Sequence, residues 1–168
     1  MKSAHVQAGL SKLEGKVSSL HVHPLKPGDP LPTVAVLTLV EGKGIQEDTR
    51  YFGRTSKSTG QPSRRQVSLM EHEQIAEHAA TLGLERIPPG AVRSNIETCG
   101  ADLSAWLGRE VEVGSAVLFF YEHRTPCGKM DAICQGLRRL MEEGRQGVMA
   151  EVRRSGVVRV GDVMRVRS

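Results

Sequence analysis

Apolar and polar residues alternate in short runs along much of the chain, and this pattern predicts a protein built mainly from β-strands. The run at 33–40 is almost continuously apolar and rich in β-branched residues, which predicts a buried strand. Glycine-containing turns, for example at Ser155-Gly156 and Gly161-Asp162, separate neighbouring runs. The predicted strands cover residues 13–23, 33–40, 92–98, 110–113, 116–121, 147–152, 157–160 and 163–166.

Two segments carry apolar residues at helical spacing instead. The first, residues 68–82, begins with Ser68 and has Glu71 three residues later, which predicts a capping box, and Gly83 marks its end. The second, residues 129–143, keeps its apolar residues on one face and is followed by a glycine. A further helical turn between the two segments brings the expected number of helices to two or three.

The length of 168 residues suits one domain, which we place at residues 13–168 after a loose leader at residues 1–12. Residues 55–65 combine Ser, Thr, Gly and Pro with several cations and show no periodicity, which predicts a flexible surface loop. About seven strands with two or three helices predict a mainly β or α+β fold, in which a β-barrel carries helical insertions.

Composition restricts the class of protein. Hydrophobic residues make up 39% of the chain and charged residues 25%, as in a folded soluble protein, and no apolar run approaches the ~20 residues that span a bilayer. The N-terminus carries no secretion signal, and three cysteines do not form a disulfide framework. We therefore expect a cytoplasmic protein with reduced thiols and no membrane partner.

The net charge of +4 favours an anionic partner, which could be a nucleic acid, a phosphate-bearing cofactor or an acidic protein surface. Aromatic residues make up only 4% of the chain, whereas proteins that bind single strands need aromatic side chains on which bases stack. Nucleic acid is therefore the disfavoured partner.

Cys127 is the residue whose position points most directly to chemistry. It lies between a predicted strand and the predicted helix at 129–143, so free backbone N–H groups and the helix dipole would stabilise its thiolate, and Arg124 and Lys129 add positive charge. From these residues alone, a reactive Cys127 and a buried structural cysteine are equal alternatives. Cys134, on the apolar face of the same helix, is expected in the core, and the cysteine and histidine spacings do not predict a zinc site.

Cations near turns and element ends are the candidates for holding a phosphate. Arg65 and Arg93 are such residues, while most other arginines occupy positions typical of a solvated face. Asn95, near the end of an extended segment, could hydrogen-bond a polar ring or stabilise a turn. His21 and His23 alternate on one strand without a visible partner and are expected to be solvated.

Several short segments follow one another in an order and spacing that are more specific than any one segment alone. They are GIQED at 44–48, YFG at 51–53, RQVSL at 65–69, PG at 89–90, RSNI at 93–96, GADL at 100–103, VGSA at 113–116, PC at 126–127 and GD at 161–162. Together they resemble the MOSC family, named for the C-terminal domain of molybdenum cofactor sulfurase, and in particular its small stand-alone bacterial members. The Glu that often precedes the family's Asn is Ser94 here, which leaves the substrate class open.

The resemblance implies a closed β-barrel with a cleft for the molybdenum cofactor, molybdopterin, and Cys127 at the position of the family's key cysteine. Such a cysteine either ligates molybdenum or carries sulfur as a persulfide, and Arg65, Arg93 and Asn95 match positions near the cofactor. Larger members contain a pyridoxal phosphate domain that abstracts sulfur from cysteine. This chain is too short to contain one, so the resemblance implies a separate sulfur donor of the cysteine-desulfurase type.

Two alternatives accompany this interpretation. Some family members are molybdenum-dependent reductases of N-hydroxylated compounds; that function would need an electron-donor protein, because the chain shows no flavin or iron–sulfur motif. The other alternative is a non-catalytic basic barrel that binds an anionic partner and in which Cys127 is only structural. Salt-dependent binding that survives Cys127→Ser would identify it.

Overall fold

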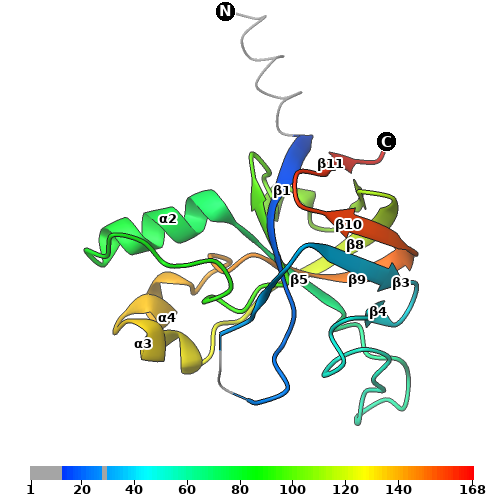
Figure 1. The fold of residues 1–168 in the computed structure, drawn as a ribbon, viewed down its shortest axis with the longest axis horizontal. Coiled ribbons are helices and arrows are strands. Elements are labelled where there is room, and N and C mark those ends of the chain that lie inside the picture. Colours follow the sequence, from blue (N-terminus) through cyan, green and yellow to red (C-terminus); the bar gives the residue numbers. More distant parts are fainter. Residues whose placement is uncertain (1–12, 28–29) are drawn as a thin grey trace, which may run out of the picture.

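Seven strands close into a barrel whose strand order places sequence-distant segments side by side (Figure 1). Around the barrel the strands are β1 (Glu14–His21), β11 (Val163–Val166), β7 (Glu110–Val113), β8 (Ala116–His123), β9 (Val148–Arg154), β5 (Val67–Glu71) and β6 (Ile96–Cys99), which returns to β1. Strands β5 and β6 run parallel, and the other neighbouring pairs are antiparallel. The computed structural model describes residues 13–27 and 30–168, so the predicted leader at 1–12 lies outside the described residues. The closed barrel confirms the predicted fold class.

The remaining elements lie on two sides of this barrel. Strand β2 (Thr33–Val34) adds to β1, and a small separate sheet contains β10 (Gly156–Arg159), β3 (Val36–Val40) and β4 (Gly44–Ile45). The described helices are α2 (His72–Thr81), α3 (Lys129–Ile133) and α4 (Leu137–Leu140), with a 3₁₀ turn at Ser104–Trp106. Helices α2, α3 and α4 gather on one side of the barrel, and the small sheet lies on the opposite side (Figure 1).

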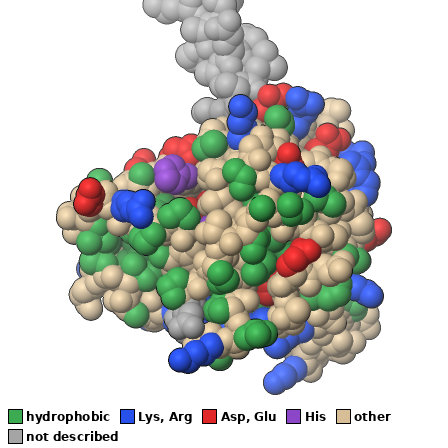
Figure 2. Space-filling view, viewed as in Figure 1, with side chains coloured by type: hydrophobic (Ala, Val, Ile, Leu, Met, Phe, Trp, Pro, Cys, Tyr) green, Lys and Arg blue, Asp and Glu red, His purple; other side chains and the backbone are tan. Residues whose placement is uncertain are grey.

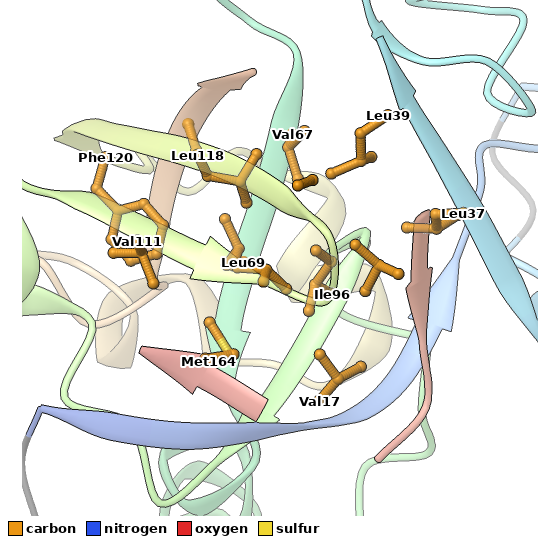
Figure 3. Close-up of a cluster of buried hydrophobic side chains, with 14 of the residues drawn as sticks. Val17, Leu37, Leu39, Val67, Leu69, Ile96, Val111, Leu118, Phe120 and Met164 are labelled. Carbon is orange, nitrogen blue, oxygen red and sulfur yellow. The ribbon is translucent and has the colours of Figure 1, made fainter. Parts of the chain in front are cut away.

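The inside of the barrel is apolar. On β8, Leu118 and Phe120 are fully buried, while the side chains between and beyond them are more exposed, as expected for a strand with one face inward. Leu37 and Leu39 of β3 join the same core, so the small sheet packs onto the barrel (Figure 3). At ~25 cal/mol per Å² of buried apolar area, this core is the main stabilising element of the fold.

A second apolar cluster lies beneath the helices. It joins Met70 of β5 to Ile75 and Ala79 of α2 and to Met130 and Leu137 of α3 and α4. Apolar side chains also gather on the outer surface over this helical side (Figure 2). Within residues 13–27 and 30–168, no helix has the length and apolar character to span a membrane.

The predicted helix at 68–82 is wrong in its first turn. Residues 67–71 instead form β5, which pairs with β6 on one side and β9 on the other, and the helix begins only at His72. Ser68 does not cap a helix, because its N–H and hydroxyl both donate to Asn95 Oδ1 at 3.0 Å. Glu71 Oε1 accepts from the Leu103 N–H instead of closing a capping box. Pairing on both edges outweighs the local helical signal.

The predicted helix at 129–143 is divided into α3 and α4. Cys134 has extended backbone angles, and Gly136 adopts a φ of 96°, a left-handed conformation that glycine reaches without steric cost. The Asp131 carboxylate then accepts from the N–H groups of Gly136 and Arg138 and fixes the break. Cys134 is therefore half-buried at this break and not in the helix core as predicted.

The apolar run at 33–40 is also two strands and not one. Its first part pairs with β1 as β2, and after Ala35 the chain passes to the small sheet as β3, where burial alternates along the strand. The predicted loop at 55–65 is confirmed as a loop, and a bridge between Thr55 and Pro62 closes it. Its flexibility stays a prediction.

Candidate functional site

A cavity of about 340 Å³ lies where the chain enters or leaves five neighbouring strands of the barrel, in the order β8, β9, β5, β6 and β1. Cys127 and Arg124 reach it after β8, Arg65 before β5 and Arg93 before β6. A smaller recess of about 30 Å³ shares several of these walls and is lined in addition by Asn95. The predicted residues, from three separate parts of the sequence, thus converge on one place.

Cys127 presents an exposed free thiol at this cavity. Gly128 follows it as the N-cap of α3, and the Cys127 carbonyl accepts from the Met130 N–H at 3.1 Å. The predicted position before a helix is therefore confirmed, although that helix is only five residues long. Exposure excludes the alternative of a buried structural cysteine.

Arg124 supplies a fixed cation behind the thiol. Its guanidinium donates to Ser94 Oγ and to three backbone carbonyls, those of Val92, Arg93 and Gln146, at 3.2–3.3 Å. Burial, together with the charges of Arg65 and Arg93, lowers the pKa of Arg124 to about 10, although Cys127 opposes the fall. The side chain still carries its full charge at neutral pH. The sequence had suggested Arg124 only as a neighbour of Cys127, and its anchoring by carbonyls from distant loops has no signal in the sequence.

Two more arginines and a lysine complete a set of four cations around the cavity: Arg65, Arg93, Arg124 and Lys129. The Arg65 guanidinium lies 5.6 Å from the centre of the Tyr51 ring. Arg93 has a φ of 63°, which is uncommon for a residue with a side chain and is often found at functional sites. Grouped cations of this kind create a positive potential that favours a bound anion.

Tyr121 and Glu122 lie on the same wall of the cavity. Burial and the Glu122 carboxylate raise the pKa of Tyr121 to about 12, although Arg64 and Arg65 oppose the rise. The phenol is therefore neutral at physiological pH, and Glu122 is an exposed anion that offsets only part of the positive charge.

A histidine and a buried carboxylate form a part of the site that sequence reasoning missed. His23 Nδ1 lies 2.7 Å from Asp48 Oδ2, and the same oxygen accepts from the His23 N–H at 3.2 Å. Burial would raise the pKa of Asp48, but the hydrogen bonds and charge of His23, together with the Asn95 amide, hold that pKa below its ordinary value. His23 is thus partnered and not solvated as expected. The two residues are 25 positions apart, and nothing in the sequence links them.

Asn95 connects this pair to the barrel. Its Oδ1 accepts twice from Ser68, and its Nδ2 donates to the His21 carbonyl at 3.2 Å and to Asp48 Oδ2 at 3.0 Å. Both donors and both acceptor positions of the amide are occupied by the protein. Of the two roles left open for Asn95, this geometry favours holding the chain in place over binding a ligand directly.

The described residues contain no cluster of three or more His, Cys, Asp and Glu side chains suited to a bare metal ion. The site instead combines one soft sulfur ligand with several anion-binding side chains. Such a set suits a ligand that has an anionic group and that carries a metal already held by atoms of the ligand itself.

A model of one protein family, described as the MOSC domain, matches residues 46–165 of the chain. Among curated proteins, none matches the sequence.

The fold is similar to three solved structures. The YuaD protein from Bacillus subtilis is 22% identical, with a TM-score of 0.76 over 92% of this chain and 96% of that one. YiiM from Escherichia coli is 18% identical, with a TM-score of 0.67 over 92% of this chain and 70% of that one. YiiM from Geobacillus stearothermophilus is also 18% identical, with a TM-score of 0.66 over 92% and 75%. At these identities the similarity concerns the fold.

Proposed function

Because this chain belongs to the MOSC domain family, we propose that it handles the molybdenum cofactor or its sulfur through Cys127. One observation carries the proposal: an exposed thiol shares a single cavity with four cations. The cations attract and orient an anionic group, and the thiol is left free to bind a metal or accept a sulfur atom.

The residues fit molybdopterin. The cavity of about 340 Å³ lies within the usual range of small-molecule sites, ~300 to 1,000 Å³. A thiolate is a soft ligand suited to a thiophilic metal, and arginine forks suit phosphate oxygens. We assign Arg65, Arg93, Arg124 and Lys129 to the phosphate and Cys127 to the metal, and Asn95 supports the wall from behind.

When bound, the cofactor would supply two-electron redox chemistry at its metal. The chain's own side chains would hold the phosphate, bind the metal through the Cys127 sulfur and orient the ligand. A reductase of N-hydroxylated compounds would in addition need an electron-donor protein as partner.

In the sulfur-carrier form of the proposal, the Cys127 thiolate attacks the outer sulfur of a persulfide on a donor of the cysteine-desulfurase type. A bond forms between Cys127 Sγ and that sulfur, the donor's S–S bond breaks, and the donor leaves as a thiolate, so no external electrons are needed. The exposure of Cys127 supports access by such a donor. This chemistry needs a reduced thiol, which supports a cytosolic location as part of the proposal.

The arrangement of charge disfavours a basic barrel that binds nucleic acid. A nucleic-acid backbone is contacted by cations spread along a groove or face, whereas here four cations converge on one small cavity. The binding-module alternative predicts affinity for nucleic acid that falls steeply with salt and is unchanged in Cys127→Ser.

The test is the molybdenum and pterin content of protein purified without oxygen from a molybdenum-supplied host. Cys134→Ser is the matched control, because Cys134 is half-buried at the helix break and does not line the cavity. Stoichiometric molybdenum in wild type and Cys134→Ser, with loss in Cys127→Ser, would support cofactor binding. Without molybdenum, a mass gain of one sulfur atom that depends on Cys127 would support the carrier form. Wild-type protein that carries neither molybdenum nor an added sulfur atom would overturn the proposal.

A further inference from the structure

His23 occupies a distinctive place in the cavity. It is 12% exposed and lines both the main cavity and the smaller recess, so its ring reaches the space where a ligand would bind. The ring packs edge-on against Tyr51 with 4.6 Å between ring centres. Its Nδ1 is held by the buried Asp48, which leaves Nε2 as the ring nitrogen not bound by that carboxylate.

The Asp48 carboxylate decides which nitrogen carries the proton. Its pKa lies below the ordinary value, so it is ionised at neutral pH and can only accept hydrogen bonds. The nitrogen that faces it, His23 Nδ1, must therefore donate. In a neutral ring, Nε2 then carries the lone pair, and a second proton on the ring must be bound there.

We propose that His23 is the acid–base residue of this cavity, with Nε2 exchanging a proton with the bound ligand and with Asp48 and Asn95 as positioning residues. The inference rests on the proposed function in taking the cavity as the ligand site, and it deepens that proposal by assigning the proton transfer. A carboxylate behind an imidazole fixes its tautomer and orientation and stabilises its protonated form.

The proton transfer needs no partner beyond ligand and water. Protonated His23 donates the Nε2 proton to an oxyanion of the ligand. The new O–H bond forms as the N–H bond breaks, the N–H electron pair stays on Nε2, and a hydronium ion from the solvent later returns a proton to Nε2. No electrons are exchanged in this step. The ligand class implied is an oxygen-bearing anion held between the cations and Cys127.

Charged groups of both signs lie around His23. A carboxylate holds its Nδ1, guanidiniums line the same recess, and an aromatic ring packs against one edge. These groups are Asp48, Tyr51, Arg65, Arg93 and Arg124. His123 is a second histidine of the cavity wall, and its Nε2 lies 3.1 Å from Ser104 Oγ.

The tautomer is tested first, by long-range ¹H–¹⁵N correlation NMR on protein labelled at histidine nitrogen. We expect His23 to carry its proton on Nδ1 in wild type and in the charge-matched control Glu41→Gln, an exposed site. In Asp48→Asn the carboxamide can donate, so Nε2–H should gain population. A dominant Nε2–H form in wild type would overturn the inference, as would an unchanged tautomer in Asp48→Asn.

The second measurement uses sulfate as the probe, because its charge is constant between pH 5.5 and 8. Sulfate should bind wild type about fivefold more tightly at pH 5.5 than at pH 8, since protonated His23 adds a cation. The affinity of His23→Gln for sulfate should differ by less than about twofold between the two pH values. If His123→Gln and not His23→Gln removes the pH dependence, the inference fails. Normal molybdenum or sulfur loading with pH-independent sulfate binding would overturn this inference alone, whereas absent loading overturns the proposed function.

Discussion

The inside of the barrel and the cavity at the strand ends use opposite kinds of side chain. Leu118 and Phe120 lie in an apolar core to which all seven strands of the barrel contribute side chains. The cavity, reached from the ends of the same strands, is lined by cations and by an exposed thiol. The apolar interior of the barrel stabilises the fold, whereas the chemically active side chains lie in the cavity at the strand ends. Keeping the charged groups outside the apolar core avoids the loss of stability that burying a charge causes.

The joint between the two regions is a network of polar contacts. Asn95 ties Ser68 of β5 to the His21 carbonyl of β1 and to Asp48, and Arg124 ties β8 to the loop before β6. The cavity wall therefore depends on hydrogen bonds from buried polar groups, each of which is expensive to leave unpaired.

The largest effect on stability is expected in the barrel core. Phe120→Ala should lower the free energy of unfolding by about 3–5 kcal/mol, because it leaves a cavity among fully buried side chains. Val160→Ala is the control, since Val160 is 52% exposed and should change stability by less than about 0.5 kcal/mol. Urea unfolding measures the free energy of unfolding of both variants. Equal effects would show that the barrel interior is not the stabilising region.

An intermediate effect is expected at the joint. Arg124→Met keeps the bulk of the side chain but removes the donors to Ser94 and three carbonyls, and should cost about 1–3 kcal/mol. The same substitution at the exposed Arg154 is the control. Arg124→Met should also weaken sulfate binding at least several-fold. A variant as stable as wild type would show that the guanidinium does not hold these loops.

A smaller effect should depend on pH. The pKa of Asp48 is depressed in the folded protein relative to its ordinary value of 3.8, so its contribution to stability is present above that value and is lost as pH falls through the folded pKa. The stability difference between wild type and Asp48→Asn should therefore narrow below about pH 4. Subtracting the stability–pH curve of Asp48→Asn from that of wild type removes the contribution of other carboxyl groups. Glu71 is one of these, and its pKa is raised by burial. A constant difference across this range would contradict the Asp48–His23 interaction.

The smallest effect on stability is expected at the thiol. Cys127→Ser should change the free energy of unfolding by less than about 0.5 kcal/mol, because the side chain is exposed, while cofactor or sulfur loading is lost. Thermal unfolding and mass analysis of the same sample test both parts. If Cys127→Ser were strongly destabilised, Cys127 would be a residue that stabilises the fold and not one that serves only the chemistry of the cavity.

The barrel and the position of the thiol could be predicted from local patterns in the sequence. Alternation along residues such as those of β7 is a local property, because it follows from one face of a strand lying inward, and so it can be read without knowing the partner strand. The position of Cys127 between a strand and a helix is local in the same way. Arg65 and Arg93 could be predicted near the site only through the order of family motifs.

The remaining features depend on contacts between segments that are distant in the sequence. Ser68 lies in a strand because β6 and β9 pair with it from both sides, and His23 is partnered because the chain brings Asp48 to its Nδ1. Asn95 connects the strands because it contacts residues 27, 47 and 74 positions away. Each of these outcomes depends on pairing between distant segments, whose energies exceed the local preferences that a sequence pattern reports.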